Sequence, residues 1–389
     1  MGQLITPGTI PMDNSSGSTG AESLYGRHFS GILPSHILGR LIRARREIFA
    51  SEDIAEIQIQ PASLDLRLGD VAYRVRASFL PGKERRVADR LQDLAIHEID
   101  LRAGAVLETG CVYVVPLLER LELSPAISAM ANPKSSTGRL DVFTRLITDY
   151  GQGFDRVDEG YRGPLYAEIS PRTFPILARR GSRLNQLRLR HGLPLVSDAQ
   201  LRKLHDEVGL VDGPADIEGG LALSVDLAGD PQTRQVGWRA RRHAGVIDID
   251  VVGACDPLDF WDPVYARKSA EIVLDPDEFY ILASREAVSI PPDFAAEMMP
   301  FNPLVGEFRV HYAGFFDPGF GHETGHGRGA RAVLEVRSRE VPFVLEHGQI
   351  IGRLVYERLT DTPPEVYGAT LGSNYQRQGL KLSKHFRQP

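Results

Sequence analysis

Ser63-Leu64-Asp65-Leu66-Arg67-Leu68-Gly69 alternates apolar and polar side chains with a period of two residues and stops at a glycine. Because successive side chains of a strand point to opposite faces of a sheet, this pattern predicts a half-buried β-strand. Further short alternating runs follow between closely spaced turn residues, at 99–101, 112–115, 121–123 and 184–189. This pattern of short strands separated by turns is typical of an all-β barrel or jelly roll. It differs from the strand–helix alternation of a parallel sheet.

The same pattern returns in the second half of the chain. Positions 224–230 echo 63–70, and nine positions between 106 and 187 recur further along the chain at one constant offset, without a gap. Glu168, for example, has Glu335 as its counterpart, and Leu187 has Leu354. A repeat of this length indicates duplication of a whole domain. We refer to the two copies as the first and the second repeat.

The domain organisation follows from this duplication. We expect a flexible tail at 1–30, the first repeat at 31–192, a connecting helix or linker at 193–215, the second repeat at 216–362 and a C-terminal tail at 363–389. The tail at 1–30 is rich in Gly, Ser, Thr and Pro. Helices are predicted to begin at Pro34-Ser35 and at Ser197-Asp198, the second one ending at Gly209.

Composition excludes several classes of protein. The 389 residues suit two domains, and 42% hydrophobic with 25% charged residues is typical of a globular protein. A net charge of −6 gives no basic surface for nucleic acid, and we expect no membrane partner because no apolar run approaches a membrane span. No signal pattern precedes residue 30, and Cys111 and Cys255 are expected as buried reduced thiols. The cytoplasm is the expected location.

Residues 133–168 carry the polar pattern that we interpret as the functional site. The turn Lys134 to Arg139 holds a cation, hydroxyls, a glycine and a guanidinium, which together suit phosphate oxygens. The stretch ends at Glu168, an acid among apolar neighbours that is costly without a partner or a task. The combination predicts a nucleotide-processing site.

These motifs resemble those of a known family. Ser135-Ser136-Thr137-Gly138-Arg139 resembles the S-S-x-x-R motif of dCTP deaminases, and 158–168 resembles their D-x-G-[WY]-x-G…L-E segment. Trimeric dUTPases, which share the superfamily, lack a glutamate at the position of Glu168. Residues 61–69 resemble the family's P-A-S-x-D-L-R-L-G, and the tail from Tyr367 resembles the segment that closes over bound nucleotide.

The resemblance implies a fold, a reaction and a set of site residues. It implies an all-β protein of two tandem dUTPase-like distorted jelly-roll or β-barrel domains with a few short helices. The implied reaction is the hydrolysis of dCTP to dUTP and ammonia without zinc. Mg²⁺ would arrive bound to the triphosphate. The implied assembly is a homo-oligomer with a trimer-like arrangement of domains. Glu168 would be the acid–base residue, Ser135 would orient the water, and Arg139 would support it. Nucleotide contacts would come from Lys134, Ser136, Thr137, Gly138, Asp158, Tyr161, Tyr166, Ala167, Tyr367, Asn374 and Gln378.

The two repeats are not equivalent. The second repeat has Asn302 in place of Ser135, Gly306 in place of Arg139 and Gly325 in place of Asp158. We therefore expect the first repeat to hold the complete site and the second to be a structural partner. Asn374 also stands where the family's tail has lysine. Two alternatives stay open: a bifunctional enzyme that yields dUMP, and a nucleotide-binding regulator that has lost catalysis. The repeat that receives the C-terminal tail is also left open.

Two zinc-like motifs do not support a metal site. His205-Asp206-Glu207 fits the H-x-E of zinc deaminases, but the sequence contains no C-x-x-C. The segment 322–326 fits H-E-x-x-H, which binds zinc only from a helix. Its neighbouring glycines make a helix improbable, so we expect no protein-held metal.

Overall fold

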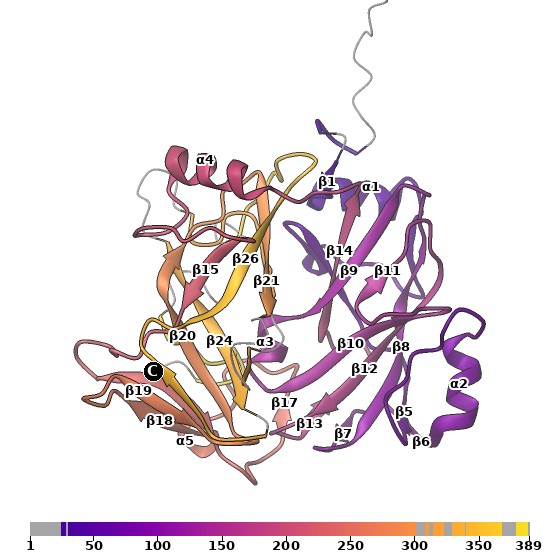
Figure 1. Ribbon diagram of the computed structural model, residues 1–389. Helices are drawn as coiled ribbons and strands as arrows, with labels where there is room; N and C mark the ends of the chain where they lie inside the picture. The colour runs from indigo at the N-terminus through magenta and orange to yellow at the C-terminus, as the bar shows by residue number, and fades with distance from the viewer. Residues whose placement is uncertain are drawn as a thin grey trace, which may run out of the picture.

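The computed structural model describes residues 25–28, 30–300, 308–310, 314–322, 329–338, 340–367 and 379–387. Over these residues the chain forms two β-rich halves that lie side by side, which confirms the predicted all-β fold with a few short helices (Figure 1). The tail predicted at 1–30 lies outside the described residues except for 25–28 and 30.

The first half consists mainly of two six-stranded sheets. One has the order β11 (Arg156–Val157), β9 (Ile127–Pro133), β14 (Asn185–His191), β4 (Ser63–Leu66), β3 (Ile59–Gln60), with β1 (Gly31–Ile32) paired to β14. The other has the order β10 (Val142–Thr148), β12 (Arg162–Pro171), β8 (Val112–Glu122), β5 (Val71–Val75), β6 (Ala95–Asp100), with β2 (Ile48–Ala50) paired to β8. All of these pairings are antiparallel, and apolar side chains from both sheets form a common core.

The second half repeats this plan with fewer strands. One sheet has the order β15 (Leu221–Ser224), β26 (Ile350–Arg358), β21 (Phe294–Pro300), β23 (Phe315–Phe316). The other has the order β18 (Trp261–Tyr265), β16 (Gln235–Ala240), β20 (Phe279–Val288), β24 (Ala330–Ser338), β22 (Phe308–Val310). Strand β21 occupies the positions of the second repeat that correspond to β9 in the first, and β24 corresponds to β12 at the same offset. The sequence repeat is therefore a repeat of strands in space.

The short helices lie around these sheets. They are α1 (Ser35–Arg43), η1 (Glu56–Gln58), α2 (Val87–Leu94), α3 (Ser135–Gly138), α4 (Asp198–Val208) and α5 (Pro257–Phe260). Helices α1 and α4 begin where the sequence predicts. In α4, the hydroxyl of Ser197 accepts a hydrogen bond from the backbone of Gln200, and Gly209 follows with a φ of 67°. No helix in the described parts of the chain is long and apolar enough to cross a membrane.

The two halves are joined by a shared small sheet and by a shared apolar cluster. Strands β13 (Ile176–Ala178) and β7 (Ala105–Leu107) of the first half form a sheet with β17 (Ile247–Asp248) of the second. The ring of Trp261 packs edge-on against two other rings. The distance between ring centres is 5.4 Å to Phe174 of the first half and 5.9 Å to Phe386 of the C-terminal segment. A two-stranded sheet of β19 (Glu271–Leu274) and β25 (Phe343–Glu346) completes the second half.

Strand β4 differs from the prediction in one respect. The alternation at 63–69 predicted a strand with one buried face, but every residue of β4 is buried, including Asp65. The reason is that Asp65 lies opposite two cations, Lys134 and Arg183, which form ion pairs with its carboxylate. A carboxylate can be buried when it is paired in this way.

Candidate active site at the α3 turn

Helix α3 is the polar turn that the sequence singles out. Backbone N–H groups of Thr137 and Gly138 donate to the carbonyl of Lys134 at 2.8 and 3.0 Å, which closes a single helical turn after β9. The hydroxyl of Thr137 donates to the carbonyl of Leu184 at 3.0 Å and ties the turn to the neighbouring chain segment. Ser136, Thr137, Gly138 and Arg139 are buried, and Ser135 is partly exposed.

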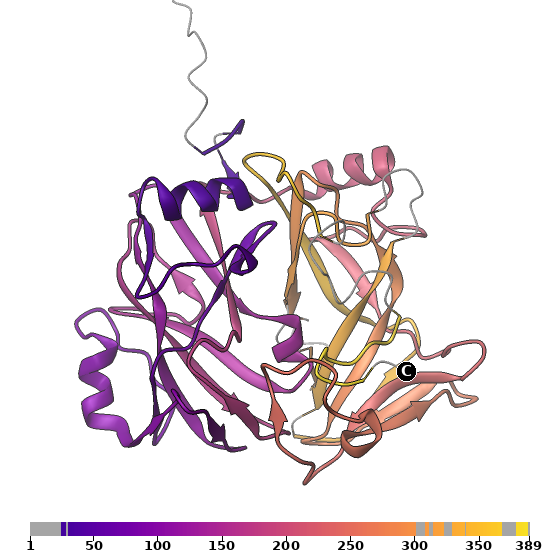
Figure 2. The ribbon, with the colours of Figure 1, turned by 180° about the vertical axis from the view of Figure 1, so that it is seen from behind.

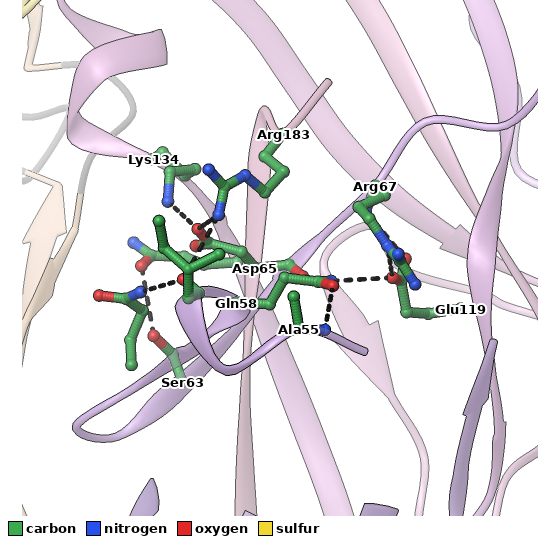
Figure 3. Close-up of polar contacts among 11 residues, drawn as sticks. Ala55, Gln58, Ser63, Asp65, Arg67, Glu119, Lys134 and Arg183 are labelled. Carbon is green, nitrogen blue, oxygen red and sulfur yellow. Dashed lines mark hydrogen bonds and ion pairs between the residues drawn. The ribbon is translucent and has the colours of Figure 1, made fainter. Parts of the chain in front are cut away.

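Positive side chains gather beside this turn. Figure 3 shows Lys134 and Arg183 converging on Asp65, which is 1% exposed. Lys384, from the C-terminal segment, lies near them. Burial lowers the pKa of Lys384, and the positive charges of Lys134 and Arg183 lower it further. Three cations thus surround one carboxylate, and the excess positive charge suits a triphosphate.

The C-terminal segment 379–387 returns to the same turn. A guanidinium nitrogen of Arg139 donates to the carbonyl of Lys381 at 2.9 Å, and the Ser383 hydroxyl donates to the carbonyl of Ser136 at 2.8 Å. Leu382 and Phe386 are buried in the apolar cluster shared by the two halves. The tail of this chain therefore packs on its own first repeat.

His385 fixes the end of that segment. Its Nε2 donates to the carbonyl of Ile249 at 2.9 Å, and its Nδ1 lies 2.9 Å from the hydroxyl of Ser383. Burial lowers the pKa of His385 to about 4, with the positive charge of Lys384 acting in the same direction. The imidazole is consequently neutral at physiological pH.

A carboxylate of the second half reaches the turn from the opposite side. Glu335 on β24 is 2% exposed, and a Cβ atom built on Gly138 would lie 2.7 Å from both the Cδ and the Oε1 atoms of Glu335. The carboxylate therefore rests against the backbone of α3. Strand β24 belongs to the second half and α3 to the first, and Figure 2 shows the two halves from behind.

Strand β24 is fixed in this position by a buried ion pair. Arg337 pairs with Asp141, which lies two residues after Arg139, and also donates to the Thr173 hydroxyl at 2.9 Å. Burial raises the pKa of Asp141, while Arg337 and Thr173 oppose that rise. Sequence reasoning did not identify Glu335 as a residue of this site, although its correspondence to Glu168 in the repeat was a signal that could have done so.

Glu168 occupies a different environment. On β12, its Oε1 accepts hydrogen bonds from Arg145 Nε at 3.1 Å and from Arg145 Nη2 at 2.5 Å. The guanidinium lies 3.4 Å from the centre of the Phe154 ring and donates to the hydroxyl of Ser78 at 2.8 Å. Glu168 is 1% exposed. Its carboxylate is held by Arg145, whereas the α3 turn is contacted by Glu335.

A second acid lies close to this pair. Burial raises the pKa of Asp155 to about 7, and the negative charge of Glu168 adds to the rise while Arg145 opposes it. Asp155 accepts a hydrogen bond from the backbone of Leu146 at 2.7 Å. This acid is not one that the sequence motifs indicated.

The other predicted residues of the 158–168 motif lie on β12 or in the segment just before it. Asp158 is exposed and accepts a hydrogen bond from Arg156 Nε at 2.8 Å. The Tyr161 hydroxyl donates to the carbonyl of Pro164 at 2.7 Å and accepts from the backbone of Asp149 at 3.1 Å, and burial raises its pKa. Tyr166 and Ala167 are buried within the strand. These residues lie on or before β12, whereas residues 134–139 follow β9.

The remaining predicted positions lie in the second half or outside the described residues. The backbone N–H of Tyr367 donates to the carbonyl of Pro318 at 2.8 Å, and its ring packs against Phe320 at 5.7 Å. Positions that lie outside the described residues are Asn302, Gly306, Gly325, Asn374 and Gln378. In the H-E-x-x-H segment only His322 is described, and its Nδ1 lies 3.2 Å from the hydroxyl of Ser289.

No metal cluster is found in the part of the chain that the structure describes, when groups of three or more His, Cys, Asp and Glu side chains are considered. His205, from the H-x-E motif, accepts a hydrogen bond from the backbone of Leu210 through Nδ1 at 3.1 Å. That contact closes the end of α4, which is a structural role.

Comparison with known proteins places this arrangement in context. The chain matches the family model for the 2'-deoxycytidine 5'-triphosphate deaminase N-terminal domain over residues 29–193, and the model for the C-terminal domain of the same enzyme over residues 197–386. A curated relative from Natronomonas pharaonis, dCTP deaminase, is 30% identical over 191 residues, which cover 47% of this chain and 90% of the relative. A relative from Beutenbergia cavernae, "dCTP deaminase, dUMP-forming", is 36% identical over 157 residues, or 38% of this chain and 77% of the relative.

A solved structure is more similar still. The crystal structure of 2'-deoxycytidine 5'-triphosphate deaminase from Agrobacterium tumefaciens superimposes with a TM-score of 0.83 and 58% sequence identity. The alignment covers 86% of this chain and 100% of that chain, so the similarity extends over both repeats.

Proposed function

The chain belongs to the dCTP deaminase family, and from this membership we propose that it hydrolyses dCTP to dUTP and ammonia at the α3 turn. One observation supports the α3 turn as the site of the reaction. The turn of Ser135 to Arg139 is contacted by a buried carboxylate on one side and by the C-terminal segment on the other. An anion-binding turn, an acid and a closing segment are what hydrolysis at a nucleotide base requires.

The reaction needs one residue to move protons. The oxygen of water bonds to C4 of cytosine, one proton of that water goes to N3, and the other goes to the amino group. The amino group then leaves as ammonia while C4 forms the carbonyl of uracil. A glutamate that takes the proton from water and passes it on can perform both transfers without a metal. The sequence motifs predict Glu168 for this role, and the contact with α3 makes Glu335 the second candidate.

The remaining groups bind and orient. We propose that Ser135 holds the attacking water and that Arg139 stabilises the charge that develops beside it. Lys134 and Arg183 would attract the triphosphate, because both already lie around Asp65 near the turn. The substrate would be dCTP in complex with Mg²⁺, whose ligands are mainly phosphate oxygens.

A second candidate function is a bifunctional enzyme that converts dCTP to dUMP. The observation in its favour is the relative named "dCTP deaminase, dUMP-forming", which is 36% identical over 77% of its length. The residues of the α3 turn are compatible with both products, so the product decides between them.

Product analysis tests the proposal. Purified protein is incubated with dCTP and Mg²⁺, and nucleotides are separated by ion exchange while ammonia is assayed. CTP, dCMP and dUTP serve as comparison substrates, a reaction with EDTA tests the need for Mg²⁺, and Ser135→Ala is the matched inactive control. We expect dUTP and ammonia in equal amounts. Accumulation of dUMP would show the bifunctional reaction, and binding of dCTP without turnover would indicate a regulator instead.

We further propose a homo-oligomer in the cytoplasm that does not act on nucleic acid. The absence of an overall basic charge supports the last point, with a net charge of −6. Light scattering coupled to size exclusion gives the number of chains in solution, and a monomer would contradict the proposed assembly.

A further inference from the structure

We infer that the acid–base residue acting at the α3 turn is Glu335, supplied by the second repeat of the same chain. One chain then holds a complete site that spans both repeats. This inference rests on the proposed deamination at α3 and names the residue that performs its proton transfers. It also gives the second repeat a catalytic role, although its own version of the turn has lost the serine and the arginine.

The first support is the position of the carboxylate. Both Oε1 and Cδ of Glu335 lie 2.7 Å from the point where a side chain on Gly138 would begin. Gly138 directly precedes Arg139 and lies three residues after Ser135, within one helical turn. A water held by Ser135 would therefore lie near a carboxylate that belongs to the second repeat.

The second support is the way in which β24 is aligned with the turn. Alternate residues of a strand point to the same face, so Val333, Glu335 and Arg337 all face the first half. Val333 packs against the apolar cluster shared by both halves, and Arg337 forms the buried ion pair with Asp141. A shift of the strand by one residue would break both contacts and would turn Glu335 away from α3.

The third support is the contrast between the two glutamates. Glu168 is held by Arg145 in an ion pair that is buried on the glutamate side, so its carboxylate is engaged within the first repeat. The carboxylate of Glu335 lies instead against the backbone of Gly138, within the same helical turn as Ser135. It is therefore placed to take a proton from a water held by Ser135.

Matched variants test the inference. Glu335→Gln and Glu168→Gln are made in the full-length protein, and kcat for dCTP, the Kd for dCTP and the thermal midpoint are measured for each. We expect Glu335→Gln to lower kcat by about 100-fold or more, with the Kd within about threefold of the parent. The loss of kcat per folded molecule should be about tenfold smaller in Glu168→Gln than in Glu335→Gln, since the carboxylate of Glu168 is engaged by Arg145.

The opposite pattern overturns the inference. A large loss of kcat in Glu168→Gln, alone or together with Glu335→Gln, would assign proton transfer to the first repeat or to both. Should Glu335→Gln fail to fold, Glu335→Asp provides the second test, because it keeps the charge and retracts the carboxylate. Unchanged kcat in that variant would also contradict the inference. An inactive parent protein, in contrast, would refute the proposed deamination itself.

Mixed assemblies test whether the site lies within one chain. Ser135→Ala and Glu335→Gln chains, each with a different affinity tag, are produced together and the doubly tagged oligomers are purified. If both groups of a site come from one chain, every site in the mixture lacks one of them and activity stays at the level of the single variants. Recovery of about a quarter or more of the parental activity would show that Glu335 serves a neighbouring chain.

Discussion

Gly138 is the residue at which the carboxylate of one repeat meets the backbone of the other. Its φ lies outside the left-handed region, so glycine is required there for space and not for backbone conformation. An alanine in a helical turn is intrinsically favourable, by up to about 1 kcal/mol relative to glycine. At this position, however, its methyl group would collide with Glu335.

We predict that Gly138→Ala lowers kcat for dCTP by about tenfold or more, because the carboxylate must move away from the water that it activates. The free energy of unfolding should change by less than about 1 kcal/mol. Steady-state kinetics and urea unfolding measure both quantities. Gly213→Ala is the control, since a side chain there would meet no atom within 4 Å. Full activity of Gly138→Ala would argue against a catalytic carboxylate at this turn.

Arg145 provides a separate test of what Glu168 does. Replacing it by methionine leaves a buried carboxylate without its cation, and loss of one member of a buried pair costs about 3–5 kcal/mol. Because the Arg145 side chain is 23% exposed, we expect the lower end of that range for Arg145→Met. Urea unfolding measures the loss, and the double variant Arg145→Met/Glu168→Gln should recover part of it. A loss below about 0.5 kcal/mol would show that the pair is not structural.

The sequence singled out candidate residues as motifs, but it could not identify which of them meet in space. The turn at 135–139 and the acid at 168 are both recognisable as motifs, and each is in an ordered, buried setting in the structure. The contact between Gly138 and Glu335 joins two positions that lie in different repeats, and no local pattern encodes such a contact. The assignment of Glu168 to the turn remains a prediction that the paired variants will decide.

Among the elements, the strands and the longer helices were the easiest to predict. Strand β4 and helices α1 and α4 follow from alternation, helical periodicity and capping residues. Helix α2 was not predicted, because its eight residues are mostly polar and only Val87 and Leu91 are buried. Its apolar residues pack with Tyr166, so this helix covers the face of β12 that carries Glu168. In the second half, the corresponding face of β24 is turned to the first repeat.

The C-terminal segment should respond to pH through His385. Its pKa is near 4 in the folded protein, below the ordinary value of 6.5, so the detached segment binds more protons between these values. Docking therefore weakens as the pH falls from about 6.5 to 4, by at most ~3 kcal/mol. Lys384 lowers this pKa, while Asp250 and Asp248 raise it.

Hydrogen exchange of residues 379–387 measures this effect. After correction for the intrinsic pH dependence of exchange, we expect protection to fall between pH 7 and pH 5 in the parent protein. The fall should be much smaller in His385→Gln, which can still donate to the carbonyl of Ile249. Equal protection of the parent at both pH values would contradict a neutral, buried His385.

At the scale of the molecule, buried charge joins the two halves. Arg188 on β14 is 1% exposed and donates to the carbonyls of Ala296 and Phe316 of the second half, at 3.1 and 3.3 Å. It also pairs with Asp317 and Glu357 at 3.4 and 3.3 Å. Burial raises the pKa of Asp317, and Arg188 opposes that rise. The arginine thus compensates two acids of the other repeat.

We predict that Arg188→Met destabilises the whole protein by about 3–5 kcal/mol, because two acids are left buried without their cation. Both halves should still unfold in one transition, since they share an apolar cluster. Differential scanning calorimetry measures the midpoint and the number of transitions. Two separated transitions in the parent would show that the halves are independent units, which the shared cluster argues against.

The duplication itself was readable from the sequence, because a constant offset between matching positions, such as Glu168 and Glu335, survives in both halves. Its consequence was not readable. The second repeat lacks the serine and the arginine of the turn, which suggested a purely structural partner. A repeat can nevertheless lose one part of a site and still supply another part to its neighbour. Which parts are combined depends on how the repeats pack, and that is determined by contacts such as Arg337–Asp141 and Trp261–Phe174.

The most direct measurement is a crystal structure of the Glu335→Gln protein with dCTP and Mg²⁺ bound. We predict that the cytosine ring lies between α3 and β24, with C4 within roughly 4 Å of the side chain at position 335 and of a water held by Ser135. The triphosphate should lie beside Lys134 and Arg183. A nucleotide bound next to Glu168 and Arg145, with α3 unoccupied, would contradict catalysis by Glu335 at the α3 turn.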